Sequence, residues 1–318
     1  MSGRLNNELQ LFAGNSHPDL ARRICDWLDI PLGQATVKRF ENDNLFVQIH
    51  ENVREKDVFV LQTARPPVNE HLMELYIMID ALKHASARRI TAVIPYYFYV
   101  RSDKKDMPRI SITARLVADL LQTAGADRVL TMTLHSEQIQ GFFSTPADHL
   151  SAVPLVCDYF RDWDLSDFVV VAPDAGSAKR AGAYAQRLGL PMAIGDKRRS
   201  PEGDVISIQC IVGDVEGRRA LLLDDEIATA SSMENLASFL REHYGVAEVY
   251  AGAAHGVFVN GALERLASPP FRATVVTDSL PLPEGAERAN IHQVSVAELF
   301  GKAIYAIHTG ESVSALFR

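Results

Sequence analysis

The chain of 318 residues has little cysteine and no long apolar run. Its cysteines, Cys25, Cys157 and Cys210, show no Cys-x-x-Cys spacing. This argues against a disulfide framework or a cysteine zinc site, and it is typical of a reducing compartment such as the cytoplasm. No apolar run reaches about 18 residues, so we expect no transmembrane helix and no membrane partner. Residues 1–8 lack an apolar core, so we expect no signal peptide.

Basic residues are also fewer than acidic residues. The 32 Lys and Arg are outnumbered by 40 Asp and Glu, which gives a net charge of −8. Because duplex phosphates are bound by a basic face, we expect no nucleic-acid partner. At roughly 150 residues per domain the length predicts about two domains. A hydrophobic content of 47% supplies their cores without disulfides or a structural metal.

Short apolar runs alternate with amphipathic stretches along the whole chain. The runs that predict strands are residues 9–15, 57–62, 89–95, 128–134, 168–173, 220–225, 249–254 and 273–278. The stretches that predict helices are residues 19–28, 69–85, 111–124, 150–163, 177–188, 232–243, 261–266 and 296–308. This order predicts an α/β fold in which mostly parallel sheets are flanked by helices. We predict two similar domains, residues 1–150 and 151–318, and allow for the tail helix to pack back on the first.

An acidic pair follows one predicted strand. Asp224 and Asp225 come directly after the apolar run 220–223, and a small-residue loop then leads into a helix. Backbone N–H groups at a helix start suit a phosphate, and adjacent carboxylates suit sugar hydroxyls or Mg²⁺. The alternative is an Asp helix cap with a Ser-rich turn. Asp174 follows another strand in the same way, and capping alone would also explain it.

Two basic interruptions follow predicted strands, at residues 101–109 and 197–204. We expect both to be loops over a site at the carboxyl edge of a sheet. Cations beside a phosphate site would stabilise a transferring phosphoryl group, whereas a solvated basic turn is the alternative. His135 opens a predicted helix and Phe40 could stack on a base, with a packing role as the alternative for each. No GxxxxGK[ST] motif occurs, which excludes a Walker-type ATP site.

Several stretches together resemble the ribose-phosphate pyrophosphokinase (phosphoribosyl pyrophosphate synthetase) family over nearly the whole chain. The stretches that carry the resemblance are residues 67–75, 78–83, 125–132, 135–143 (HSEQIQGFF), 173–176 (PDAG), 196–199 (DKRR) and 310–317 (GESVSALF). The resemblance implies two phosphoribosyltransferase-type domains and a homo-oligomer built from dimers, usually a hexamer. It also implies transfer of the β,γ-diphosphate of ATP to the anomeric hydroxyl of ribose 5-phosphate, giving phosphoribosyl diphosphate and AMP.

The resemblance assigns roles to matching residues. For ATP they are Phe40 and Asn42 at the adenine, partly across a subunit boundary, then Arg101, Lys104 and His135, with Mg²⁺ held by His135 and Asp174. For the transferring group they are Lys197 and Arg199. For ribose 5-phosphate they are Asp224 and Asp225 at the hydroxyls, with Thr229, Ala230, Ser231 and Ser232 at the 5-phosphate. For a regulatory phosphate site they are Arg54, Gln140, Asp148, Ser312, Ser314 and Phe317.

Some ligand positions depart from the family pattern. Thr133 and Ser144 replace acids, and Ala228 replaces the acid of a glycine-containing loop. Further departures are Asn44, Asn52 and Ser102, while Glu226 adds an acid beside Asp225. Two functions therefore stay open: the synthetase, and a weakly active or inactive paralogue that binds ligand or regulates a true synthetase. A purine-type phosphoribosyltransferase is a distant third, because those are normally single-domain chains.

Overall fold

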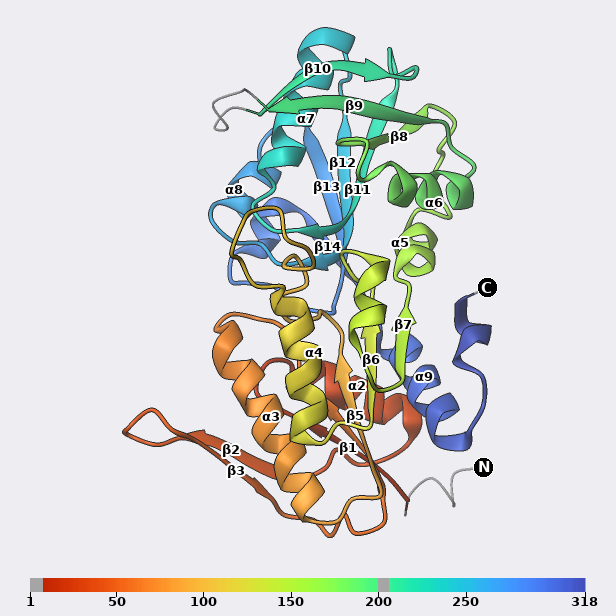
Figure 1. Cartoon of the computed structure of the whole chain (residues 1–318). Coiled ribbons are helices and arrows are strands. Elements are labelled where there is room, and N and C mark those ends of the chain that lie inside the picture. The colour runs from red at the N-terminus through yellow and green to blue at the C-terminus, as the bar shows by residue number, and fades with distance from the viewer. Residues whose placement is uncertain (1–7, 200–205, 318) are drawn as a thin grey trace. The chain divides into compact units, whose positions relative to one another are not determined.

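The computed structural model describes residues 8–199 and 206–317. The chain divides into two compact units (Figure 1). Unit 1 consists of Met1–Ser151, Ser279–Pro281 and Val296–Arg318, and unit 2 consists of Ala152–Asp278 and Leu282–Ser295. Neither unit is one continuous stretch of chain.

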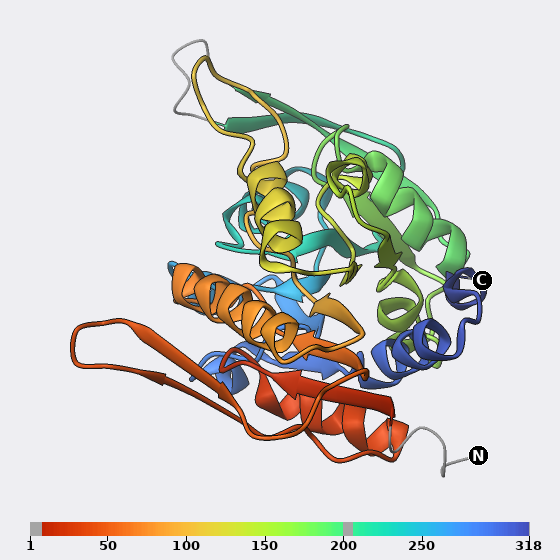
Figure 2. The same cartoon turned by 60° about the horizontal axis from the view of Figure 1, so that its bottom comes forward.

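Unit 1 is built on a five-stranded sheet. In spatial order its strands are β1 (Leu9–Ala13), β4 (Asp57–Leu61), β5 (Arg89–Ile94), β6 (Arg128–Met132) and β7 (Ala147–Leu150), and every neighbouring pair is parallel. The helices are α2 (Pro18–Leu28), α3 (Val68–His84), α4 (Thr113–Ala124) and α9 (Ala297–Thr309). Figure 2 shows α3 and α4 on one side of this sheet and α2 with α9 on the other.

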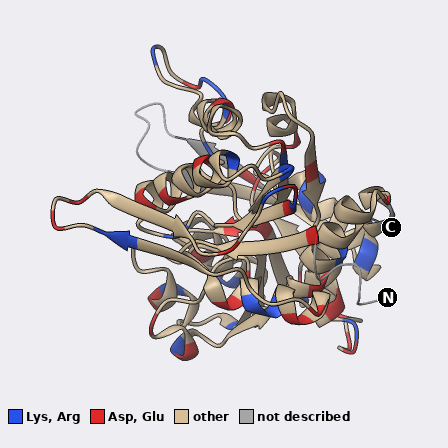
Figure 3. Ribbon diagram, turned by 90° about the horizontal axis from the view of Figure 1, so that it is seen from below, with Lys and Arg blue, Asp and Glu red and all other residues tan. Residues whose placement is uncertain are grey.

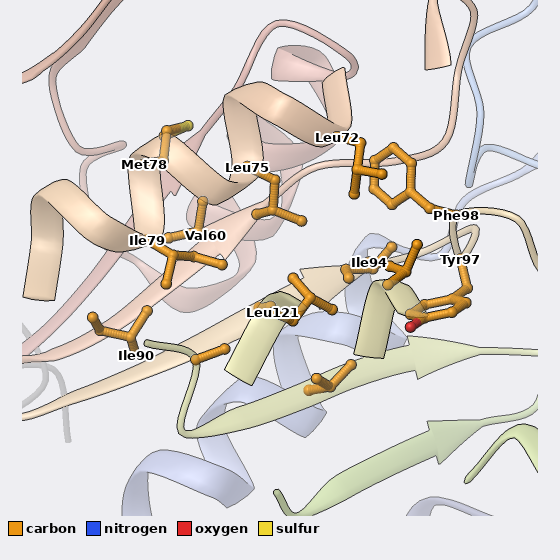
Figure 4. Close-up of a cluster of buried hydrophobic side chains, with 14 of the residues drawn as sticks. Val60, Leu72, Leu75, Met78, Ile79, Ile90, Ile94, Tyr97, Phe98 and Leu121 are labelled. Carbon is orange, nitrogen blue, oxygen red and sulfur yellow. The ribbon is translucent and has the colours of Figure 1, made fainter. Parts of the chain in front are cut away.

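The core of unit 1 follows from the alternation of side chains along its strands. Val58 and Val60 are buried in the cluster that α3 and α4 cover, whereas Phe59 and Leu61 are buried outside that cluster. Figure 4 shows Leu75 and Ile79 of α3 pointing toward the strand residues, with Leu121 of α4 nearby. Strands buried on both faces are typical of a parallel sheet between helix layers.

Helix α9 is held against the rest of unit 1 by polar contacts as well as by packing. The buried Asp57 carboxylate accepts hydrogen bonds from Arg89, with Nε···Oδ1 at 2.8 Å, and pairs with His308 Nδ1 at 2.9 Å. Arg89 also donates to the carbonyl of Ile307, near the end of α9. The α2 and α9 helices pack closely, because a Cβ at Gly301 would lie 2.4 Å from the ring of Trp27.

A two-stranded antiparallel hairpin, β2 (Ala35–Arg39) and β3 (Leu45–Ile49), also belongs to unit 1. Figure 2 shows it extending away from the main sheet. Its partly buried residues pack against the core near α3, and its tip is exposed. The sequence analysis did not predict this hairpin, because each strand is short and only half-buried.

Unit 2 is built on a seven-stranded sheet. In spatial order its strands are β10 (Ile206–Val212), β9 (Met192–Arg199), β8 (Phe168–Ala172), β11 (Arg219–Ile227), β12 (Val249–Gly256), β13 (Phe271–Thr277) and β14 (Ile291–Val294). All neighbouring pairs are parallel except β9 and β10. Buried residues of α5 (Val153–Tyr159) and α6 (Ala178–Leu188) form one core cluster, and those of α7 (Ser231–Tyr244) and α8 (Ala262–Leu266) form another.

Every predicted helix and strand has an observed counterpart, but several of the bounds differ. The helix expected at residues 150–163 is confined to α5, which begins with a proline in its first turn. The strand expected at 220–225 continues to Ile227. Residues 197–199 were expected in a loop, and this was wrong: they belong to β9, where Lys197 pairs with Ile208 and Arg199 with Ile206. Antiparallel pairing uses backbone groups only, so a run of cations does not prevent it.

Basic and acidic residues are interspersed along many of the helices and strands. Lys and Arg lie near Asp and Glu on many elements in Figure 3, and ion pairs such as Arg115 with Asp119 and Lys302 with Glu298 are local to one helix. None of the helices in the described residues is long and apolar enough to cross a membrane.

Candidate active site

An acidic pair and one arginine form the centre of the candidate site in unit 2. Asp224 and Asp225 lie on β11 beyond its last pairing with β8, at Leu222. Arg180, in the first turn of α6, donates from Nη1 to Asp224 and to Asp225, the second at 2.5 Å. Asp225 is buried and Asp224 is partly buried. The sequence analysis missed Arg180. A sequence signal for such a residue is an arginine in the first turn of a helix that follows a strand, because that turn lies at the carboxyl edge of the sheet.

The two carboxylates share one environment and cannot ionise independently. Burial is the main reason that the pKa of Asp224 is raised to about 7, and hydrogen bonding and repulsion from Asp225 add to it. The positive charge of Arg180 acts in the opposite direction. With this pKa, Asp224 is divided between its protonated and ionised forms near neutral pH.

The loop after β11 opens helix α7. Ala230 has φ 59° and ψ 1°, the left-handed conformation that favours glycine, and it directly precedes the helix. A non-glycine residue there costs roughly 1–2 kcal/mol. Thr229 Oγ1 lies 2.9 Å from Ser231 Oγ, so the two hydroxyls are adjacent. Ser231 and Ser232 are the first two residues of α7, and the N-terminal end of a helix favours an anion.

Asp174 lies at the carboxyl end of β8, as predicted, and it takes part in a tight turn. Its Oδ1 accepts from the backbone N–H of Ser177 at 3.0 Å, and Ser177 Oγ donates to its carbonyl at 2.9 Å. Strand β9 passes close to this turn, because a Cβ at Gly195 would approach the carbonyl oxygen of Pro173 to 2.9 Å. Asp174 therefore does not cap α6, whose N-cap is Ser177, but this turn ahead of the helix fixes one of its carboxylate oxygens at the sheet edge.

Two predicted catalytic residues are described only in part. Lys197 and Arg199 lie on β9, two and four residues beyond Gly195, and their side chains fall outside the described part of the chain. The remainder of the predicted basic loop, residues 200–204, lies outside the described residues as well. The backbone of β9 passes the turn of Asp174 at Gly195 and then continues to Lys197 and Arg199.

The second basic cluster lies in unit 1. Arg101 and Lys104 are exposed in the segment between β5 and α4, which contains neither helix nor strand. The segment begins where β5 ends, as predicted. Tyr97 anchors its base: the ring is buried and its hydroxyl donates to the carbonyl of Ala114 at 3.2 Å. A buried base and exposed cations suit a segment that binds a polyphosphate from solution.

The turn that carries His135 follows β6. Thr133 has φ 42°, an uncommon conformation for a β-branched residue, and its N–H donates to the carbonyl of Leu150. The next residue, Leu134, donates its N–H to Nε2 of His149 at 2.9 Å. Burial lowers the pKa of His149, so its ring stays neutral and can accept this bond. His149, which the sequence analysis missed, thus holds the turn that presents the partly exposed His135. An isolated histidine on a strand gives no sequence signal for such a role.

Phe40 and Asn42 lie in the turn of the β2–β3 hairpin. The Phe40 side chain is 47% exposed, so the core alternative for it is wrong. Its ring lies 5.5 Å from that of Phe46, and the Lys38 ammonium lies within 5.5 Å of both ring centres. The Asn42 side chain accepts from the backbone N–H of Asn44. An exposed aromatic ring with a cation beside it is a suitable surface for stacking a base.

The predicted regulatory residues are spread over three segments of unit 1. Arg54 is exposed between β3 and β4, and Gln140 is exposed on the 3₁₀ helix η1 (Glu137–Phe142). Asp148 on β7 is ion-paired with Arg128. Ser312 and Ser314 are exposed near the 3₁₀ helix η3 (Val313–Phe317), which packs against β7, and the Phe317 side chain is outside the described part.

Comparison with known proteins places this architecture in a class and a family. The phosphoribosyl transferase domain matches residues 155–256, the N-terminal domain of ribose phosphate pyrophosphokinase matches residues 9–125, and the phosphoribosyl synthetase-associated domain matches residues 206–318. The class is thus a two-unit protein of the phosphoribosyltransferase type. The chain belongs to the ribose-phosphate pyrophosphokinase family.

Relatives from several bacteria match from end to end. The ribose-phosphate pyrophosphokinase of Caldanaerobacter subterraneus subsp. tengcongensis is 49% identical over 315 residues, 99% of each chain. That of Deinococcus radiodurans is 49% identical over 314 residues, 97% of this chain and 98% of its own. The crystal structure of phosphoribosylpyrophosphate synthetase from Mycobacterium smegmatis superposes with a TM-score of 0.90 at 42% identity, covering 96% of this chain and 100% of that one. The family resemblance and the predicted fold class are confirmed.

Proposed function

We propose that the chain transfers the β,γ-diphosphate of ATP to the anomeric hydroxyl of ribose 5-phosphate. The anomeric oxygen forms a bond to the β-phosphorus, the bond from that phosphorus to the α-phosphoryl oxygen breaks, and AMP leaves. The proton of the anomeric hydroxyl passes to solvent. The observation that carries the proposal is the Arg180–Asp224–Asp225 cluster ahead of the loop that opens α7, in a chain 49% identical to a ribose-phosphate pyrophosphokinase.

In unit 2, Asp224 and Asp225 accept hydrogen bonds from the ribose hydroxyls, and Arg180 offsets their combined charge. Thr229, Ala230, Ser231 and Ser232 surround the 5-phosphate with backbone N–H groups and hydroxyls. This assignment is supported by the raised pKa of Asp224, since two adjacent acids, one buried and one partly buried, beside one arginine are a typical functional arrangement.

In unit 1, Phe40 and Asn42 bind the adenine, while Arg101 and Lys104 bind the phosphates. His135 donates a hydrogen bond to the nucleotide. Lys197 and Arg199, on β9 of unit 2, stabilise the charge that develops on the transferring group. Arg54, Gln140, Asp148, Ser312, Ser314 and Phe317 form a regulatory phosphate site.

The donor set of the candidate site fits Mg²⁺. Within the described residues no three His, Cys, Asp or Glu side chains gather as a ready-made metal cluster. Mg²⁺ does not require one, because it is held by one or two carboxylates together with substrate phosphates and water. Asp174 is the carboxylate we assign to it, and His135, a nitrogen donor, is better suited to the ATP phosphates. When bound, the ion neutralises phosphate charge.

We also propose that the protein is cytoplasmic and forms a homo-oligomer built from dimers, a hexamer as is usual in the family. The free cysteines, of which Cys25 and Cys157 are buried, fit a reducing compartment. Light scattering on the purified protein measures the oligomeric order. No observation favours the inactive paralogue, and none of the relatives described above is named as a regulator.

The test is AMP formation from ATP that depends on ribose 5-phosphate. We expect AMP only when both substrates are present, and phosphoribosyl diphosphate in equal amount. Lys197→Ala should lower kcat at least about 100-fold, because it removes charge stabilisation made mainly in the transition state. Binding of ribose 5-phosphate by that variant should change little. AMP release without ribose 5-phosphate, or full turnover in Lys197→Ala, would contradict the assignment.

A further inference from the structure

The carbonyls of three successive residues, from the end of β11 into the following loop, accept hydrogen bonds from residues that come after β12. Ile227, Ala228 and Thr229 supply these carbonyls. Their donors are the N–H groups of Val257 and Phe258 to Ile227 at 2.9 and 3.1 Å, that of Val259 to Ala228 at 2.9 Å, and Arg265 Nη1 to Thr229 at 2.8 Å. The first two carbonyls are bound by backbone groups, so only the third depends on a side chain.

A hydrogen bond that fixes the direction of a carbonyl also fixes the direction of the N–H group in the same peptide unit. In a trans peptide the C=O of one residue and the N–H of the following residue point in opposite directions. The N–H groups of Ala228, Thr229 and Ala230 are therefore turned away from the donors of the segment after β12. None of the three donates a hydrogen bond within the described part of the chain. Successive N–H groups that point to one side form a concavity for an anion.

The third peptide of this series needs the most restraint. Ala230 adopts a left-handed conformation without being glycine, which costs roughly 1–2 kcal/mol and persists only when the surroundings hold it. The carbonyl that Arg265 binds belongs to the peptide that joins Thr229 to Ala230. Arg265 is thus placed at the strained point of the loop.

Arg265 is itself fixed at three points. Its Nη1 also donates to the carbonyl of Asn260 at 2.8 Å, and its Nε pairs with Glu234 Oε2 at 2.9 Å. Glu234 lies in the first turn of α7, so the guanidinium spans the loop, the start of the helix and the start of α8. A planar guanidinium can reach these acceptors together, whereas a lysine ammonium on a flexible stem cannot reproduce that fork.

We propose that Arg265 is a positioning residue for the 5-phosphate, acting through the Thr229 carbonyl to hold the loop open for the anion, with Glu234 orienting it. This inference rests on the proposed function, because it takes the loop as the ribose 5-phosphate site. Arg265 is not a catalytic residue, since its contacts are with the chain.

The experiment compares Arg265→Gln, Arg265→Lys and Glu234→Gln with the unaltered protein and with Arg272→Gln. Arg272 is the matched control, an exposed arginine of unit 2 that pairs with Glu248. The measurements are steady-state kinetics, calorimetric titration with ribose 5-phosphate, and hydrogen exchange of residues 228–232. We expect Arg265→Gln to raise KM and Kd for ribose 5-phosphate about 10- to 100-fold. We expect kcat and KM for ATP to change less than about threefold, because the contact precedes the chemical step.

The two other variants separate position from charge. Arg265→Lys keeps the charge and should remain close to Arg265→Gln, while Glu234→Gln should give a smaller rise in KM. Exchange in residues 228–232 should be faster in all three and unchanged in Arg272→Gln. Full rescue by lysine would make the effect one of charge and overturn the inference. Loss of thermal stability with unchanged KM would also overturn it, leaving Arg265 a structural residue. Absence of ribose 5-phosphate binding by the unaltered protein would overturn the proposed function and this inference together.

Discussion

Thr133 combines two unusual properties in one residue: a left-handed backbone and a neutral side chain where the family pattern has an acid. Aspartate and asparagine adopt the left-handed region more readily than a β-branched residue. Both substitutions should therefore relieve the same backbone cost, and only aspartate adds charge. This pair of variants separates conformation from metal binding.

We expect Thr133→Asp to lower the free Mg²⁺ needed for half-maximal AMP release, because charged oxygen ligands bind Mg²⁺ more strongly than hydroxyls. Thr133→Asn should leave the requirement unchanged. The measurement is a Mg²⁺ titration at fixed ribose 5-phosphate and fixed total ATP. Equal half-saturation in the aspartate and asparagine variants would show that position 133 does not face the metal.

The pair Asp224 and Asp225 predicts a pH dependence of stability. Burial raises the pKa of Asp224 to about 7, above its value in the unfolded chain. The folded state thus holds a proton that the unfolded chain has released. The stabilisation from this group is complete below the unfolded pKa and is lost as pH rises through about 7.

Asp224→Asn should remove this slope, since an amide does not ionise. Denaturant unfolding between about pH 5 and pH 8 should therefore show the variant gaining stability relative to the unaltered protein as pH rises. Asp214→Asn, at an exposed carboxylate paired with Arg218, is the control and should keep the original slope. Parallel pH curves for the Asp224 variant and the unaltered protein would mean that Asp224 is ionised throughout.

At the scale of elements, the start of α7 carries a conformational cost that glycine would remove. Ala230→Gly should stabilise the protein by about 0.5–1 kcal/mol, the relief of the left-handed strain less the added freedom of the unfolded chain. Ala183→Gly, on the exposed side of α6, should instead destabilise by about 1 kcal/mol. Denaturant unfolding measures both. A loss of stability in Ala230→Gly would show that the methyl group contributes more by packing than the backbone costs.

Helix α9 depends on a charge that has no access to solvent. Burial alone would raise the pKa of Asp57, but hydrogen bonds from His308 and Arg89 outweigh it and hold the pKa below its usual value. Its contribution is therefore present above the unfolded pKa and is lost as pH falls through the folded one. Asp57→Asn should cost roughly 3 kcal/mol near neutral pH, because it leaves a partly buried arginine unpaired.

Hydrogen exchange of residues 297–309 should accelerate in Asp57→Asn, and its stability deficit should shrink in acid. Asp119→Asn removes an exposed ion pair within one helix and should cost less than about 0.5 kcal/mol. If both variants cost the same, the buried cluster would not anchor α9.

Elements with strong periodicity were predicted from sequence, and those set by distant pairing were not. The helices α2 and α6 have clear amphipathic patterns, and β8 and β11 have short apolar runs, so local information suffices for them. Strands β2, β7 and β14 are short and only partly buried, and these three, like β10, are defined by the neighbour with which each pairs. In the site, the acids at strand ends were predictable, whereas Arg180, His149 and Arg265 act through contacts with residues 15 to 45 positions away.

At the scale of the whole molecule, each unit is assembled from segments that are separated in the sequence. The path leaves unit 1 after Ser151, returns at Ser279, leaves again after Pro281 and returns at Val296. The contacts of Asp57 with His308 span 251 positions, a separation at which no local pattern carries information.

This return of α9 has a consequence for the newly made protein. Unit 1 begins first on the ribosome, yet the face of α2 that packs on α9 stays uncovered until residue 309 has been synthesised. The residues of unit 2 are all available by position 295. The unit that starts earlier is therefore the one completed later, and a transcript cut short before α9 yields a chain with an exposed apolar surface, a substrate for chaperones and proteases.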